Sequence, residues 1–134
     1  MRKYLPTLAD LIDRMSICQL KEIFIPDQRQ AYKDEIALIK HDIDLILSER
    51  RLNATQVHAI MVIMLTNRYI WENESKARQG GSEQDKLLKL THSINGVRNT
   101  AKNVLSHESD ERVDLKIDCF SAELIEEFGH WDIF

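Results

Sequence analysis

Glycine and proline are scarce in this chain of 134 residues, which holds four glycines and two prolines. Both residues interrupt regular secondary structure, proline because it lacks an amide hydrogen and glycine because its backbone is so free. Runs of β-branched residues, which favour strands, are also few. These shortages indicate a chain that is helical nearly throughout and therefore of the all-α class.

Long apolar runs and cysteines are scarce as well. The longest uninterrupted apolar run covers residues 59–65, whereas a membrane-spanning helix needs about 20 apolar residues. The first ten residues lack the apolar core of a signal peptide. Only two cysteines occur, Cys18 and Cys119, without metal-ligand spacing. We therefore expect a cytoplasmic chain with no membrane partner and with two reduced thiols, although a disulfide between them stays open.

The charge balance is weakly acidic. Net charge is -4 at pH 7, with 30% charged and 43% hydrophobic residues. This balance gives no overall attraction to a nucleic-acid polymer or to an anionic membrane. The length suits one domain with a buried core. We expect a single helical domain over residues 1–134 that does not bind nucleic-acid polymers.

Capping residues and apolar spacing define the first two helices. Thr7 with Asp10 forms a capping box for the first helix, which ends near Pro26. Asp27 is the expected cap of the second helix, which runs to about residue 50. Its apolar seam has the spacing of a coiled coil. The isoleucine seam consists of Tyr32, Ile36, Ile39, Ile43 and Ile46.

The rest of the chain is organised around residues 54–106, read as two helices folded back on each other. Asn53 or Thr55 caps the first of them, and Gly80 and Gly81 supply the turn. The first is apolar on nearly all sides at its start, which predicts the most buried helix of the fold. The residues expected inside are Val57, Ile60, Met61 and Met64.

The C-terminal part completes the expected architecture. A short fifth helix is predicted at about residues 121–128, and the apolar end of the chain is expected to dock through Trp131 and Phe134. The predicted fold is an antiparallel four-helix bundle with this short C-terminal helix.

Polar residues interrupt the inward lines of the helices at residues 54–106. If the two helices face each other, these residues form either a satisfied network that fixes the register or a ligand site. The candidate ligand-binding residues are Asn67, Trp71, Glu74, Arg78, Asn95, Arg98, Asn99 and Lys102.

The two interpretations differ in their charge balance. In the network, Glu74 pairs with the cations of the next helix. In the ligand site, Arg78, Arg98 and Lys102 exceed the charge of Glu74, so a small anion completes the set and Trp71 offers a flat face for a ring. The favoured anions are a nucleotide or a phosphorylated sugar, and in a phage such a protein would sequester a host signalling nucleotide. The alternative function is a protein–protein interaction module, dimeric through the isoleucine seam, with a structural network.

Catalysis has little support. His41 and Asp42 resemble half of a metal phosphohydrolase doublet, but no second His and Asp are placed. The glutamates lack the two facing E-x-x-E pairs of a helical pyrophosphatase, and no inward E-x-x-H occurs. Neither cysteine has a histidine close in sequence. We expect no metal and no cofactor. A non-catalytic role is favoured over an enzymatic one.

Three segments resemble a known group of proteins. N-x-x-I-W-x-x-E-x-x-x-R at residues 67–78, followed by I-N-x-x-R-N at residues 94–99, is similar to small uncharacterised helical proteins of bacteria and tailed phages. Those proteins carry LW-x-x-E-D and then I-D-x-L-N-x-x-R-N, and D-R-M-S-I-x-x-L-K at residues 13–21 is similar to their opening. This chain departs at Ser75, where an acid is common, and at residues 93–95. The resemblance implies a site along the polar stripe and no particular activity.

Overall fold

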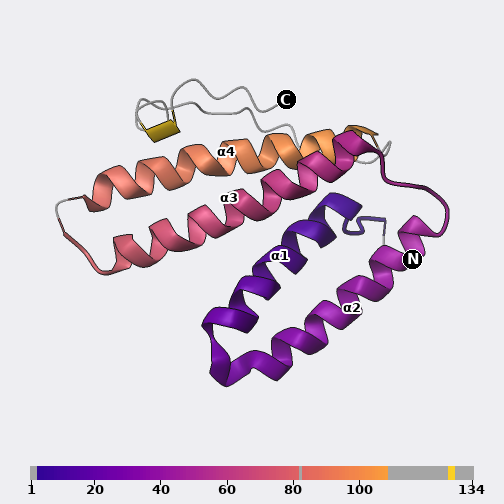
Figure 1. Cartoon of the computed structure of the whole chain (residues 1–134), viewed down its shortest axis with the longest axis horizontal. Coiled ribbons are helices and arrows are strands. Elements are labelled where there is room, and N and C mark those ends of the chain that lie inside the picture. Colours follow the sequence, from indigo (N-terminus) through magenta and orange to yellow (C-terminus); the bar gives the residue numbers. More distant parts are fainter. Residues whose placement is uncertain (1–2, 82, 109–126, 129–134) are drawn as a thin grey trace.

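The structure is a computed structural model that describes residues 3–81, 83–108 and 127–128 (Figure 1). Within these residues it contains no strand and four α-helices, so the all-α class is confirmed. Apart from residues 127–128, the expected fifth helix lies outside the described residues, as do Cys119, Trp131 and Phe134. The helices are α1 (Leu8–Phe24), α2 (Arg29–Leu47), α3 (Ala54–Arg78) and α4 (Gln84–Glu108), with a 3-10 turn, η1 (Pro26–Gln28), after α1.

Side-chain caps begin α1 and α3 as the sequence predicts. Thr7 Oγ1 accepts the Asp10 amide at 3.1 Å, and Asp10 Oδ2 accepts the Thr7 amide at 3.1 Å. Asn53 and Gln56 form the same reciprocal pair at 2.8 and 3.0 Å. Each box satisfies amides that the first helical turn cannot bond internally, so both helix starts are fixed by local sequence.

The start of α2 differs from expectation. Asp27 lies within η1, and the residue before α2 is Gln28, which makes no side-chain capping bond. The prediction of an Asp27 cap is wrong because Pro26 starts the 3-10 turn first. Arg29 instead closes the end of α1, since its Nε donates to the Glu22 carbonyl at 2.8 Å.

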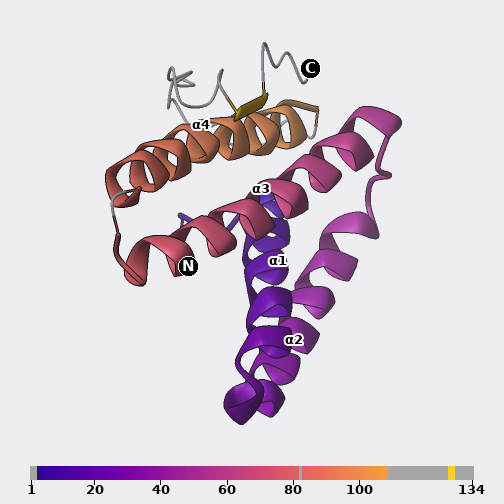
Figure 2. The same ribbon diagram turned by 60° about the vertical axis from the view of Figure 1, so that its left-hand side comes forward.

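The four helices form two pairs. Both views show α3 and α4 side by side and joined at Gly80–Gly81, whose positive φ values of 79° and 111° suit glycine (Figures 1 and 2). Helix α1 packs against α3, α4 and α2, whereas α2 packs only against α1 and η1 among the described elements. Helix α1 therefore joins the two pairs.

The core lies where α1 meets the α3–α4 pair. Ile43 and Ile46 of α2 pack on its edge, so the isoleucine seam faces inward, within the chain. None of the helices in the described ranges is long and apolar enough to span a membrane. The buried core residues are Leu8, Ala9, Ile12, Ala59, Val62, Ile63, Ile70, Leu90, Ile94, Val97, Ala101 and Leu105.

The prediction of which α3 residues point into the core is largely wrong. Val57, Met61 and Met64 are 42%, 64% and 36% exposed, and Ile60 is half-buried. A helix start that is apolar on all sides does not indicate which side is buried. The buried side is fixed elsewhere, by small Ala59 and by Ile63, both 0% exposed. We call Val57, Met61, Met64 and Leu65 the outer face of α3.

The burial of α3 is testable with a matched pair of variants. Ile63→Ala should lower the free energy of unfolding by about 2–5 kcal/mol because it leaves a cavity in the core. Met61→Ala, two residues away on the exposed side of α3, should stay within about 0.5 kcal/mol of wild type. Urea denaturation followed by circular dichroism measures both. Equal losses would contradict the observed rotation of α3.

Candidate functional site

Polar side chains from three helices meet beside the core. At their centre is Asn67 of α3, which is 3% exposed. Its Nδ2 donates to Asp13 Oδ1 at 2.7 Å and to Ser16 Oγ, both on α1. Its Oδ1 accepts from Arg98 Nη1 of α4 at 2.8 Å. One amide therefore joins α1, α3 and α4 through both of its ends.

Arg98 is held by amides and not by carboxylates. Its Nη1 bonds to Asn67, and its Nη2 donates to Asn95 Oδ1 one turn earlier on α4 at 2.5 Å. Its Nε is buried without a hydrogen-bond partner among the described residues. The guanidinium is thus anchored at one edge and has one donor unsatisfied.

Lys102 supplies the second cation of the cluster. Its Nζ lies 3.1 Å from Asp10 Oδ1 and 3.5 Å from Asp13 Oδ2, and its side chain is only 15% exposed. Two carboxylates thus face two cations, so the cluster carries no surplus of formal charge. We call these residues the polar network: Asp10, Asp13, Ser16, Asn67, Asn95, Arg98 and Lys102.

The surroundings of Asp10 shift its acidity. Partial burial acts to raise the pKa of this carboxyl, but the Thr7 amide and Lys102 outweigh that effect and hold the pKa below its usual value. The carboxylate closes the α1 capping box and also pairs with α4. Its ionised form therefore stabilises both the helix start and the contact between helices.

The structure brings together only part of the predicted site. Asn67, Asn95, Arg98 and Lys102 all belong to the polar network. Asn99 is half-buried on α4, and no described hydrogen bond joins it to the network. On α3, Arg98 bonds to Asn67 and not to the expected Glu74. The carboxylates that balance the α4 cations belong to Asp10 and Asp13 of α1.

Glu74 and Arg78 lie apart from the network. Their side chains are 46% and 78% exposed and pair with each other at 3.8 Å along α3. The expected pairing of Glu74 with the α4 cations is therefore wrong. The cause is the rotation of α3, which turns Asn67 inward and leaves the last turns of the same stripe at the surface.

Trp71 contacts the last residue of α1. Its ring stacks on Phe24 with centroids 5.9 Å apart and an interplanar angle of 28°. Arg68 lies over the Phe24 ring at 4.7 Å from its centroid and pairs with Glu72 at 2.8 Å. The flat face expected to hold a ligand ring is thus in contact with the chain itself.

Three residues of the polar network, all on α1, are not among the candidates predicted from the sequence: Asp10, Asp13 and Ser16. From the sequence alone, Asp10 is expected only to cap α1, and Asp13 and Ser16 belong only to the D-R-M-S run. Their spacing of three residues puts them on neighbouring turns of one side of α1, beside the core residues Ala9 and Ile12. This row of polar residues beside the apolar line is the sequence pattern that indicates a polar contact on α1.

The thiol and histidine candidates lack catalytic geometry in the described chain. Cys18 is buried, and burial together with the Glu35 carboxylate raises the pKa of its thiol, which opposes nucleophilic activation. Glu35 is paired with Arg14 at 2.7 Å. His41 and Asp42 pair at 3.2 Å on the surface. The described residues contain no cluster of three or more His, Cys, Asp or Glu able to hold a metal ion.

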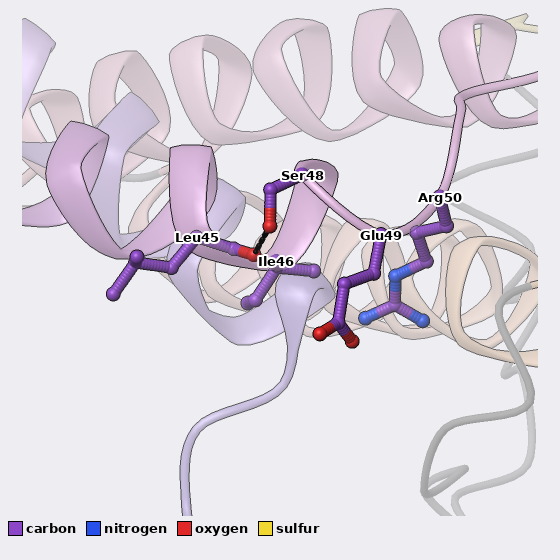
Figure 3. Close-up of a pocket in the computed structure, with 5 residues that line it drawn as sticks. All are labelled: Leu45, Ile46, Ser48, Glu49 and Arg50. Atoms are coloured by element: carbon purple, nitrogen blue, oxygen red, sulfur yellow. Dashed lines mark hydrogen bonds between the residues drawn. The ribbon is translucent and has the colours of Figure 1, made fainter.

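One hollow in the described surface lies away from the polar network, at the C-terminal end of α2. It has a volume of about 670 Å³ and is lined by Leu45, Ile46, Ser48, Glu49 and Arg50 (Figure 3). Ser48 Oγ donates to the Leu45 carbonyl at 2.7 Å, so the hydroxyl is used in ending the helix.

Comparisons of the chain with family models, with curated proteins and with solved structures found no match. The residues of the polar network define a partly buried, charge-balanced contact between three helices, with an exposed apolar face on the opposite side of α3.

The role of Asp10 predicts a pH dependence. Because its folded-state pKa is lowered, its contribution is complete above about pH 4, the usual aspartate value, and is lost as pH falls through the lower folded-state pKa. The difference in unfolding free energy between wild type and Asp10→Asn should therefore be largest at about pH 6–7 and shrink below about pH 4.

Urea denaturation at constant ionic strength measures this difference. Asp44→Asn, at an exposed position of α2, is the matched control and should differ little from wild type at any pH. A constant gap between wild type and Asp10→Asn down to about pH 3 would show that the carboxylate charge contributes nothing.

Proposed function

We propose that this chain is a non-catalytic protein–protein interaction module of the cytoplasm, an antiparallel four-helix bundle whose polar network is structural. The observation that carries the proposal is the outer face of α3. Met61 and Leu65 are 64% and 58% exposed, in the middle of the helix with the longest apolar run of the sequence. Exposed apolar patches on small soluble domains commonly mark binding surfaces.

The charge balance of the polar network supports its structural role. Lys102 is matched by Asp10 and Asp13, and Arg98 fills the acceptors of Asn67 and Asn95. A buried polar group lowers the stability of the fold little when it is hydrogen-bonded. When its partner is lost, the free energy of unfolding falls by roughly 1–3 kcal/mol. Such a network fixes one alignment of α1 on the α3–α4 pair.

The outer face of α3 has the chemistry of a docking surface. It combines two methionines, which adapt their shape to a partner, with two branched side chains. The isoleucine seam of α2 packs inward against α1 and the core, so it is not the proposed surface, which is the outer face of α3. Residues 59–67 include no charged residue. His58 and Arg68 stand immediately before and after them in the sequence.

Site-specific crosslinking in living cells tests this function. A photo-reactive benzophenone amino acid replaces Met61 in one variant and Leu38, 72% exposed on α2, in the control. We expect a discrete covalent adduct from position 61 that is absent from position 38, because only the α3 face holds a partner. No adduct from position 61, or equal adducts from both positions, would contradict the proposal.

A second function, binding of a small anion such as a nucleotide or a phosphorylated sugar, is favoured by one observation. Arg98 Nε is buried and lacks a partner among the described residues, and a phosphate oxygen would satisfy this donor. The resemblance to proteins of bacteria and tailed phages fits such a role, with sequestration of a host signalling nucleotide as its biological form.

Arg98→Met separates the two functions. If the network is structural, the variant leaves the Asn67 and Asn95 oxygens without a donor and should lose about 1–3 kcal/mol of unfolding free energy. The exposed Arg78→Met is the control and should be nearly neutral. Anion binding instead requires that a panel of nucleotides and sugar phosphates raise the melting temperature of wild type, by mass action, and fail to raise that of Arg98→Met. A flat panel would rule out this second function.

A further inference from the structure

We infer that Glu127 and Phe128 form a strap, an intramolecular contact that docks on Tyr69 of α3 and holds the free end of the α3–α4 pair closed. The free end is the part of the two helices next to the Gly80–Gly81 turn, residues 72–78 and 84–89. This device goes beyond the interaction function proposed above and does not depend on the outer face of α3.

The free end has little packing of its own. Asn73 and Ala77 are the only buried residues among residues 72–78, and none of residues 84–89 is buried. The core residues of the pair lie instead at positions 59–70 of α3 and 90–105 of α4. A segment with so few buried apolar contacts opens at a low free energy unless another part of the chain holds it.

Phe128 contacts α3 where its apolar core ends. The Phe128 ring meets the Tyr69 ring edge-on, with centroids 5.1 Å apart and an interplanar angle of 66°. Tyr69 in turn packs against the core, one residue before Ile70, the last core residue of α3. Both views show residues 127–128 beside α4 (Figures 1 and 2). A residue late in the chain is therefore tied to α3 at the base of the free end.

The position of Phe128 is remote from the end of α4. Leu105, near that end, lies beside the start of α3, because its carbonyl accepts from Gln56 Nε2 at 3.4 Å. Tyr69 comes thirteen positions after Gln56, which is about 20 Å along the helix at about 1.5 Å per residue. Phe128 thus lies about 20 Å back along the pair, towards the Gly80–Gly81 turn. The contact is a long-range one that the chain makes after leaving α4.

Glu127 acts on the hydroxyl of the same tyrosine. Burial raises the pKa of the Tyr69 phenol, the Asn73 amide lowers it, and the Glu127 carboxylate raises it through its charge and a hydrogen bond. Glu72 of α3 adds a further charge effect in the same direction as Glu127. The two strap residues therefore both reach Tyr69, one at its ring and the other at its hydroxyl.

Asn73 opposes closure of the strap. Its side chain is 3% exposed, and its Nδ2 is buried without a hydrogen-bond partner among the described residues. Opening of the free end admits water, which bonds to this donor and removes the cost of leaving it unpaired. The contacts of Glu127 and Phe128 favour the closed state and Asn73 favours the open one, so single side chains can shift the balance.

Hydrogen exchange of the full chain, followed by NMR at each amide, tests the strap. Phe128→Leu keeps an apolar side chain but removes the ring. It should speed exchange at the free end by about 2- to 12-fold, the factor that an aromatic pair contributes beyond its buried area. Tyr4→Leu removes a 74% exposed ring outside the strap and should leave these rates unchanged. Amides of residues 58–63, in the core half of α3, should exchange as in wild type in both variants.

A double-mutant cycle tests whether the two rings act as a pair. Once Tyr69→Leu has removed one ring, adding Phe128→Leu should speed free-end exchange no further, because the contact is already lost. Fully additive effects of the two substitutions would overturn the docking of Phe128 on Tyr69. Free-end rates in Phe128→Leu equal to those of wild type would overturn the strap as a whole.

Two further variants test the polar side of the strap. Asn73→Leu removes the unpaired donor and should slow free-end exchange by about 5-fold or more, the opposite sign to Phe128→Leu. Faster exchange would overturn the role of Asn73. Glu127→Gln should lower the pKa of Tyr69, followed by NMR titration of its ring carbon, whereas Glu83→Gln at an exposed position should leave it unchanged. An unchanged Tyr69 pKa in Glu127→Gln would overturn the contact of Glu127 with the hydroxyl.

Discussion

The arrangement of the helices depends on one buried amide. The Asn67 side chain donates to α1 and accepts from α4, so a shift of either helix along α3 would leave one of its ends unpaired. An apolar contact tolerates small translations, because one methyl group can replace another, whereas a hydrogen bond does not. The hydrophobic core provides most of the stabilisation, and Asn67 selects the alignment in which that core forms.

Around this amide the chain balances its charges by using a helix distant in sequence. Lys102 of α4 pairs with Asp10 and Asp13 of α1, which precede it by roughly 90 residues. The capping box that starts α1 shares its carboxylate with this pair. The local signal that begins a helix is thus the same group that docks the helix, so secondary and tertiary structure are coupled through Asp10.

Much of the fold was predictable because its determinants are local. The Thr7 and Asn53 boxes, the break at Pro26 and the turn at Gly80–Gly81 depend on a few neighbouring residues, and the helices begin or end near them. Of the site, Asn67, Asn95, Arg98 and Lys102 could be predicted from polar positions beside apolar lines. Their partners on α1 could not, because periodicity within one helix carries no information on which other helix it faces. The rotation of α3 was misjudged for a related reason: an apolar segment such as residues 57–65 gives no contrast between its sides.

The attachment of α2 to α1 alone has a consequence for the order in which the molecule opens. Helix α2 can separate from the rest without exposing the surface between α3 and α4. Separation of α1, in contrast, breaks its contacts with three helices. Native-state hydrogen exchange should therefore divide the amides into at least two cooperative units, with those of α2 exchanging through a smaller opening of lower free energy. Helix α2 would then be the pliable part of the molecule, and α1 with the α3–α4 pair the more rigid part, so that mobility is distributed by topology rather than by loop length.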